Sequence, residues 1–124
     1  MRSTNYEGFM TMSKYLKVLK QIDKRMTAKG YKLVSVSDGE ESLSSAGNGK
    51  NAMYEWATQC DCGTMTYVTP YDSVNRCTFY LIYGNAIYET IADMGYNTEK
   101  AEQDCEQVAD EVAEHFERLH KEYA

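Results

Sequence analysis

The chain has 124 residues, 43% of them hydrophobic, a single proline and a net charge of −6. That size and composition predict one folded domain with one hydrophobic core and exclude a disordered chain. The acidic balance disfavours a general affinity for nucleic acids or anionic membranes, and no apolar run reaches the roughly 18 residues of a membrane span. We expect a cytoplasmic protein whose four cysteines are reduced thiols.

The first part of the chain is expected to form a helix and a strand. Residues 1–11 are predicted to be a flexible leader, so that the α+β domain covers 12–124. A helix is predicted from Thr11 or Ser13 to Lys29, with apolar residues at steps of three and four, and Gly30 suits its C-terminal cap. A strand follows at 31–37, and the Gly-, Ser- and Asn-rich segment 38–49 is predicted to be a mobile loop.

The middle of the chain predicts a short helix and three strands. A helix at 50–60 carries Met53, Trp56, Ala57 and Cys60 on one face, and Trp56 is expected to lie between this helix and the sheet. Strands are predicted at 65–69, at 76–83 and at 86–93. The second should be central because both of its faces are apolar, and Gly84-Asn85 predicts a two-residue hairpin before the third.

The last helix is predicted to run from a cap at Asn97 or Thr98 to residue 123, again with one apolar stripe. The predicted order of elements is therefore α-β-α-β-β-β-α. Three consecutive strands with short connections favour an antiparallel arrangement. We expect an α+β fold in which the N- and C-terminal helices pack on a four-stranded, mainly antiparallel sheet.

No motif predicts a catalytic centre, a bound cofactor or a metal site. Cys60 and Cys62 are separated by one residue and the other two cysteines, Cys77 and Cys105, are far away, whereas a structural zinc site usually has two close pairs. The sequence predicts core or surface thiols, and a small cysteine-containing metalloprotein is kept as a second alternative. An enzyme is not expected.

Charge is sorted along the chain. Residues 14–32 contain seven basic residues and one acid, whereas the segment from Asp93 to the C-terminus contains ten acids and three basic residues. This last segment therefore carries −7 (three minus ten), and residues 1–92 carry +1 (ten minus nine). Six acids of the last helix recur at steps of three and four along one side and form what we call the acidic stripe: Glu99, Glu102, Glu106, Asp110, Glu114 and Glu117.

Like charges at this spacing repel one another by a few tenths of a kcal/mol per pair, so something should offset the repulsion. One option is internal, with Lys17, Lys20 and Lys24 of the first helix facing Glu106, Asp110 and Glu114. The second option is a basic partner outside the chain, and the third is a merely solvated acidic face. The sequence leaves all three open.

Four short segments are Lys29-Gly30-Tyr31, residues 34–41, and the two runs Tyr80–Asn85 and Tyr88–Asp93. These segments resemble small phage- and prophage-encoded α+β accessory proteins of unassigned function. The resemblance implies a mobile-element accessory protein that acts in the host cytosol, and it implies no catalytic residues.

These observations predict a non-enzymatic protein that binds a host protein through the acidic stripe and Tyr88, one of eleven tyrosines. The partner is expected to be basic or to bind nucleic acids itself, with no direct contact between this chain and nucleic acid or membrane. A homodimer is compatible with the sequence. The alternative is a DNA-mimic inhibitor of a host DNA-binding or defence protein, which requires the acids to be exposed and unpaired.

Overall fold

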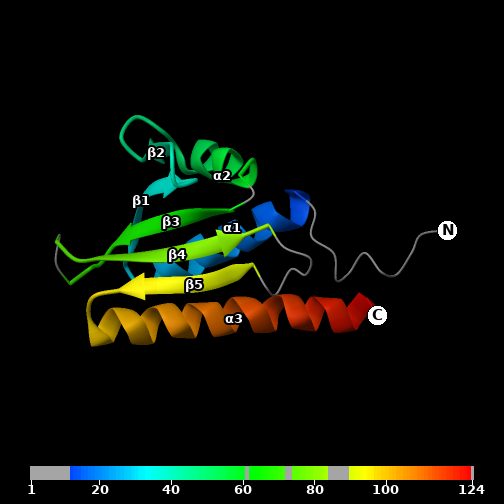
Figure 1. Ribbon diagram of the computed structural model, residues 1–124. Helices are drawn as coiled ribbons and strands as arrows, with labels where there is room; N and C mark the ends of the chain where they lie inside the picture. Colours follow the sequence, from blue (N-terminus) through cyan, green and yellow to red (C-terminus); the bar gives the residue numbers. More distant parts are fainter. Residues whose placement is uncertain (1–11, 61, 72–73, 84–89, 124) are drawn as a thin grey trace.

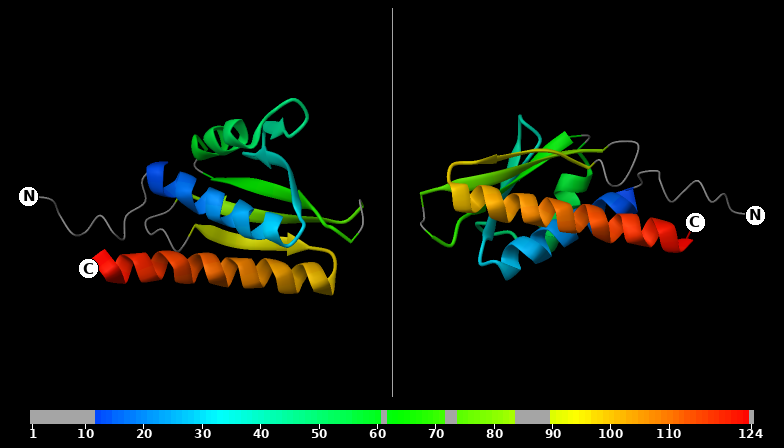
Figure 2. Two further views of the ribbon diagram at one scale, coloured as in Figure 1. Left: turned by 180° about the vertical axis from the view of Figure 1, so that it is seen from behind. Right: turned by 90° about the horizontal axis from the view of Figure 1, so that it is seen from below.

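The computed structural model describes residues 12–60, 62–71, 74–83 and 90–123, so the predicted leader at 1–11 lies outside the described residues. These residues form three helices and one antiparallel sheet (Figure 1). The two views in Figure 2 place helices α1 (Met12–Ala28) and α2 (Lys50–Thr58) against one face, while helix α3 (Glu99–Tyr123) runs along the edge formed by strand β5 (Ile91–Tyr96). The predicted α+β class, with helices from both ends of the chain on the sheet, is confirmed.

The sheet has five strands in the spatial order β2-β1-β3-β4-β5, and all neighbouring strands are antiparallel. Their bounds are Lys32–Ser37 (β1), Ser42–Ser44 (β2), Cys62–Val68 (β3), Arg76–Ile82 (β4) and Ile91–Tyr96 (β5). The prediction of four strands was wrong, because β2 follows β1 directly and gives the order α-β-β-α-β-β-β-α.

The missed strand β2 lies within the segment 38–49 that was predicted to be a loop. Asp38 shapes the turn before it, because its Oδ1 accepts the backbone N–H groups of Glu40 (2.9 Å) and Glu41 (2.7 Å). Gly39 adopts a φ of 97° in the same turn, a conformation that other residues rarely adopt. A strand of three residues with a single apolar side chain has no alternating pattern from which it could be predicted.

The hairpin turn predicted at Gly84-Asn85 lies outside the described residues. A two-residue turn there would pair Leu81 with Tyr88, whereas Leu81 pairs with Ile91 in the described strands. The described strand β5, Ile91–Tyr96, extends beyond the predicted range of 86–93 at its C-terminal end. A register shift within the β4–β5 pair adds a further irregularity that turn chemistry alone does not reveal.

Strand β4 is an inner strand, but only one of its faces is covered. Cys77, Phe79 and Leu81 are buried, whereas Tyr80 and Ile82 on the opposite face are 45% and 41% exposed. The predicted inner position is confirmed, but the apolar residues of its second face are exposed because the described helices lie on the other side of the sheet. The side that carries these exposed residues, which we call the open face, remains uncovered by the described helices (Figure 2).

Helix α1 spans Met12–Ala28, close to the predicted range. Its end has the hydrogen bonds of a Schellman motif: the Tyr31 N–H donates to the Met26 carbonyl (3.1 Å), and the Gly30 N–H donates to the Thr27 carbonyl (2.9 Å). Gly30 has a φ of 94°, which confirms the predicted left-handed cap. This cap turns the chain directly into β1.

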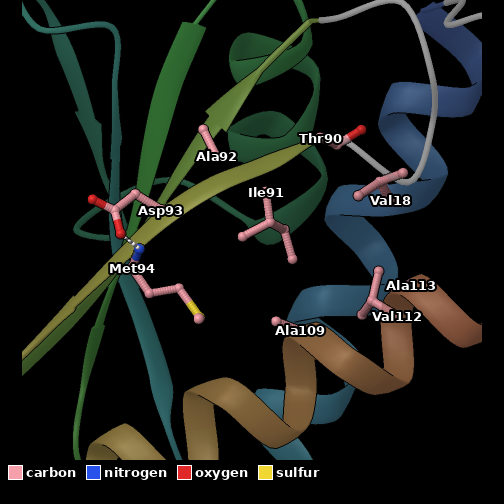
Figure 3. Close-up of a pocket in the computed structure, with 9 residues that line it drawn as sticks. All are labelled: Val18, Thr90, Ile91, Ala92, Asp93, Met94, Ala109, Val112 and Ala113. Carbon is pink, nitrogen blue, oxygen red and sulfur yellow. Dashed lines mark hydrogen bonds between the residues drawn. The ribbon is translucent and has the colours of Figure 1, made fainter.

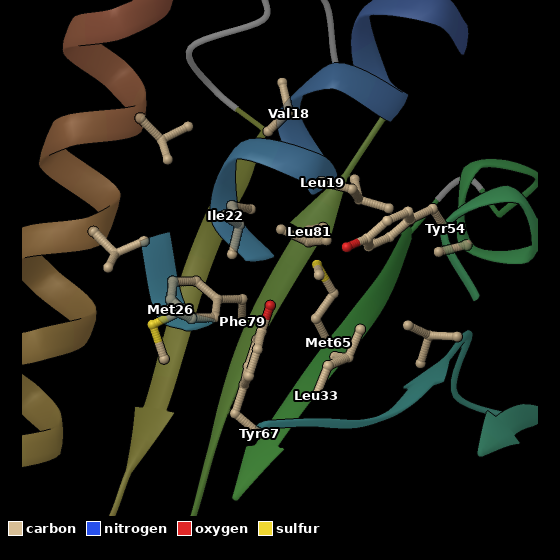
Figure 4. Packing of buried hydrophobic residues seen from close by; sticks show 14 of the residues in the cluster. Val18, Leu19, Ile22, Met26, Leu33, Tyr54, Met65, Tyr67, Phe79 and Leu81 are labelled. Carbon is tan, nitrogen blue, oxygen red and sulfur yellow. The ribbon is translucent and has the colours of Figure 1, made fainter. Parts of the chain in front are cut away.

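Helix α2 spans Lys50–Thr58. Its core-facing side chains are those of Met53, Tyr54 and Ala57, which are buried, whereas Trp56 packs at the margin of the core and is only partly buried. Trp56 is therefore less buried than its predicted place between helix and sheet requires, and the fully core-facing aromatic residue of α2 is Tyr54, whose hydroxyl reaches Asp23 of α1 (Figure 4). Helix α3 spans Glu99–Tyr123, and no described helix is long and apolar enough to cross a membrane.

The core lies between the sheet and the three helices (Figure 4). Helix α1 contributes the largest group, and residues of α2, α3, β1, β3 and β4 complete the cluster together with Tyr31. The α3 residues in this cluster are Cys105, Val108, Val112 and Phe116, which follow the predicted apolar stripe of the last helix. The burial of these four residues determines which side of α3 faces away from the sheet.

Candidate binding surface on the C-terminal helix

The acidic stripe lies on the side of α3 that points away from the core. All six of its residues are exposed, whereas the buried residues of α3 occupy the opposite side of the helix. A helix turns by 3.6 residues, so steps of three and four keep the six carboxylates in one row. The predicted stripe therefore exists as a continuous acidic ridge on the surface.

The N-terminal turn of α3 stabilises the first two acids of the stripe. The hydroxyl of Thr98 accepts the backbone N–H of Ala101 (3.1 Å), which confirms one of the two predicted caps. Glu99 and Glu102 lie in the first turn, where the partial positive charge of the helix N-terminus stabilises carboxylates. The remaining four acids lie beyond the first turn, where this effect of the helix N-terminus falls off.

The stripe is largely without internal ion pairs. Among the residues that the structure describes, Glu99, Glu102, Asp110 and Glu114 form no salt bridge. Glu106 accepts a hydrogen bond from the hydroxyl of Tyr96 (3.2 Å), and burial together with this bond raises the pKa of Tyr96. Four carboxylates thus remain available to a partner.

The internal option, in which three lysines of α1 face the stripe, does not hold for the residues named. Lys17, Lys20 and Lys24 are exposed, and no salt bridge joins them to the stripe in the described chain. The salt bridges to α3 come instead from the end of α1 and the residue after it: Arg25–Glu111 (3.4 Å) and Lys29–Asp104 (4.0 Å).

The rotation of α3 about its own axis explains which of its acids meet α1. Residues 104 and 111 lie on the flank of α3 that faces α1, whereas the stripe lies about a quarter turn or more further round. The contacts along this flank fix the two helices side by side and leave the stripe directed outward. Tyr88, the seventh residue predicted for the surface, lies outside the described residues.

Most of the buried tyrosines that the structure describes form hydrogen bonds to buried aspartates and are not part of the surface. Tyr54 and Tyr67 donate their hydroxyls to the two carboxylate oxygens of Asp23, the bond from Tyr67 being 2.9 Å long. Asp23 is only 2% exposed, and its third partner is the ammonium of Lys50 (2.9 Å), whose side chain is 48% exposed. Burial and the bonds to Asp23 raise the pKa of both tyrosines.

A second buried carboxylate, Asp104, is held in the same way. Tyr31 and Tyr71 donate to its Oδ2 (2.7 and 2.9 Å), and Lys100 donates to its Oδ1 (3.1 Å). Burial acts to raise the pKa of Asp104, but the hydrogen bonds from Tyr31, Tyr71 and Lys100 outweigh it and lower the pKa. The carboxylate is therefore charged and fully engaged.

Sequence analysis missed both clusters. Each one joins a helix to the sheet through a charge that accepts two neutral hydroxyls, an arrangement that satisfies a buried carboxylate without a nearby nucleophile or histidine. Asp23 was visible as the single acid among the basic residues of α1, but its partners lie on α2 and β3. We interpret these clusters as links that hold the structure together.

The cysteines do not converge. Cys62 is exposed, Cys60 is half-buried, and Cys77 and Cys105 are buried in contact with each other. The hydrogen bond to Cys105, followed by burial, raises the pKa of the Cys77 thiol. No group of three or more potential metal ligands comes together within the described ranges of the chain.

A cavity of about 310 Å³ lies between β5, α3 and the side of α1 (Figure 3). Its walls are mainly apolar, and Asp93 is the one titratable residue among the described residues that line it. The exposed carboxylate of Asp93 accepts the backbone N–H of Met94 (2.8 Å). The cavity therefore contains no pair of groups suited to acid–base chemistry.

Comparison with protein-family models, with curated proteins and with solved structures found no match to this chain.

Proposed function

We propose that this chain is a non-enzymatic binding protein, of the phage or prophage accessory type, that engages a basic host protein through the acidic stripe of α3. The observation that carries the proposal is the exposure of all six acids on the side of α3 opposite the core. Four of them form no salt bridge with any described residue, and the helix N-terminus stabilises only the two of these in the first turn, Glu99 and Glu102.

A basic partner would supply the missing compensation. Complementary charge steers the encounter and fixes the orientation of two proteins, while affinity comes from a few buried anchors. Tyr96, which already contacts Glu106, lies beside the stripe and is the described aromatic residue best placed to serve as an anchor. The binding is expected to weaken as the salt concentration rises.

A DNA mimic is the second candidate, and the outward acids favour it. The stripe extends over 18 helical steps, or about 27 Å, so its carboxylates recur about every 5 Å. One DNA strand carries a phosphate about every 3.4 Å along the axis, and duplex DNA presents two strands. A single and sparser row matches a basic groove on a protein better than it matches the whole footprint of a DNA-binding site.

The test is affinity capture from a bacterial lysate with the wild-type chain and with Glu106→Lys/Asp110→Lys/Glu114→Lys. The matched control is Glu40→Lys/Glu41→Lys/Glu55→Lys, which changes the net charge by the same amount at three other exposed acids. We expect one or more basic proteins to be captured by the wild type and by the control variant, and to be lost with the stripe variant.

Identical captured sets from the wild type and the stripe variant would contradict the choice of surface. Captured proteins are then challenged with duplex DNA at low salt. Release of the partner by DNA would favour the mimic, whereas a ternary complex would favour the basic-protein interpretation.

A further inference from the structure

The open face of the sheet carries two adjacent rows that are rich in hydroxyl side chains. Strand pairing aligns residues from all five strands in each row. The first row contains Ser44, Ser35, Thr66, Thr78 and Gly95, and the second contains Ser42, Ser37, Thr64, Tyr80 and Asp93. The hydroxyls of Thr66 and Thr78 lie 3.2 Å apart, within hydrogen-bond distance.

The charge of this face differs from that of the rest of the protein. Its strand residues include only three charges, on Lys32, Arg76 and Asp93, which sum to +1 (two minus one), whereas the whole chain carries −6. The acidic stripe lies on α3, behind the sheet at its β5 edge (Figure 2). Two copies of this acidic protein can therefore bring their open faces together with little repulsion between charges.

The positions of the charges select one arrangement of two such copies. Arg76 pairs with Val68 in a row on one side of the Thr66–Thr78 row, and Asp93 lies in the row on the other side. A two-fold axis that runs across the strands above the Thr66–Thr78 row exchanges these two outer rows. It places Arg76 of one copy over Tyr80 of the other and beside Asp93 of that copy.

A two-fold axis along the strands would instead bring Arg76 of one copy toward Lys32 of the other. The axis across the strands thus brings opposite charges together, whereas the axis along the strands brings like charges together. The axis across the strands also forms each favourable contact twice, as an isologous interface requires. It also adds a cation–π contact between Arg76 and the exposed ring of Tyr80.

We propose that the open face is the interface of a symmetric homodimer, in which two sheets pack face to face and Arg76 of each copy meets Asp93 and Tyr80 of the other. Strands spaced by about 4.8 Å, and rows spaced by about 6.7 Å, give a flat area of roughly 400 Å² per copy. This is about half of the standard interface area per partner, so the dimer is weak and depends on concentration.

The test measures the molar mass by sedimentation equilibrium at protein concentrations from about 1 µM to 1 mM. We expect the wild-type mass to rise toward twice that of one chain. Arg76→Glu and Asp93→Arg should each weaken dimerisation at least about 10-fold, and the double variant Arg76→Glu/Asp93→Arg should regain most of it. Within one sheet the two residues lie about 13 Å apart along the strand direction, so this recovery reports a contact between copies.

Glu114→Arg, a charge reversal on the acidic stripe, is the matched control and should leave the dimer unchanged. Tyr80→Glu is a second disrupting variant, and far-UV circular dichroism verifies that each variant is folded. A wild type that remains a monomer up to 1 mM would overturn the proposal, and so would single reversals without effect or a double variant that stays as weak as the single ones.

Discussion

Replacement of Asp23 by alanine is the sharpest test of the interpretation that the buried tyrosine–aspartate clusters hold the structure together. The carboxylate joins α1 to α2 through Tyr54 and to β3 through Tyr67, and its side chain is 2% exposed. In Asp23→Ala both hydroxyls lose their acceptor and remain in the core. Lys50 loses its ion pair, but its half-exposed ammonium can be hydrated.

The magnitude follows from these differences in exposure. A buried hydroxyl without a partner costs about 1–3 kcal/mol, so two of them cost about 2–6 kcal/mol. The exposed partner contributes less than about 1 kcal/mol, as surface ion pairs usually do. Asp23→Ala should therefore lower the free energy of unfolding by about 2–6 kcal/mol, and Lys50→Met by less than about 1 kcal/mol.

The assay is urea unfolding followed by far-UV circular dichroism, with linear extrapolation to water. A third variant, Asp23→Leu/Tyr54→Phe/Tyr67→Phe, removes all three polar groups and should recover part of the loss, because no unsatisfied hydroxyl remains. The reasoning is refuted if Asp23→Ala destabilises the protein no more than Lys50→Met does. It is also refuted if the triple variant is less stable than Asp23→Ala.

Three further predictions follow from described contacts. Burial and Asp23 raise the pKa of Tyr54 and Tyr67 above 10.0, so their neutral hydroxyls stabilise the fold below about pH 10, and this stability is lost as the pH rises further. Measurements of the free energy of unfolding from about pH 8 to 12 should show the decline, and Tyr54→Phe should make the decline smaller. Gly63→Ala would place a Cβ 2.8 Å from a backbone carbonyl oxygen of β1 and should lower the free energy of unfolding in urea by about 1–3 kcal/mol. In Gly95→Ala the new Cβ would lie 3.5 Å from a tyrosine ring, so the free energy of unfolding should fall much less. Maleimide labelling followed by mass spectrometry should modify Cys62 in the native protein and Cys77 only after denaturation, and equal labelling rates would contradict the described core.

The parts of the fold that depend on a local pattern were predictable. Leu19, Ile22 and Met26 recur at helical spacing and are buried, and the alternation of Cys77 and Phe79 identifies the inner strand β4. The acidic stripe was predictable for the same reason, since one helix carries all of its members at steps of three and four. Its exposure follows from the apolar stripe on the opposite side of that helix.

The parts that depend on distant residues were not predictable. Burial of Asp23 depends on Tyr67, which is 44 positions away, and burial of Asp104 depends on Tyr31, which is 73 positions away. The pairing of the terminal helices failed for a related reason. Charge complementarity predicts which helices attract each other, but the rotation of each helix about its axis decides which side chains meet, and packing sets that rotation.

The position of α3 has a consequence for how the protein is made. This helix is synthesised after the other described elements, yet it supplies Cys105, Val108, Val112 and Phe116 to the core and, through Asp104, accepts the hydroxyl of Tyr31, the residue before β1. A nascent chain that ends before α3 leaves those core surfaces uncovered and Tyr31 without its acceptor. Native structure should therefore be completed only after synthesis has passed the C-terminal helix, and prematurely terminated chains should be substrates for chaperones and proteases.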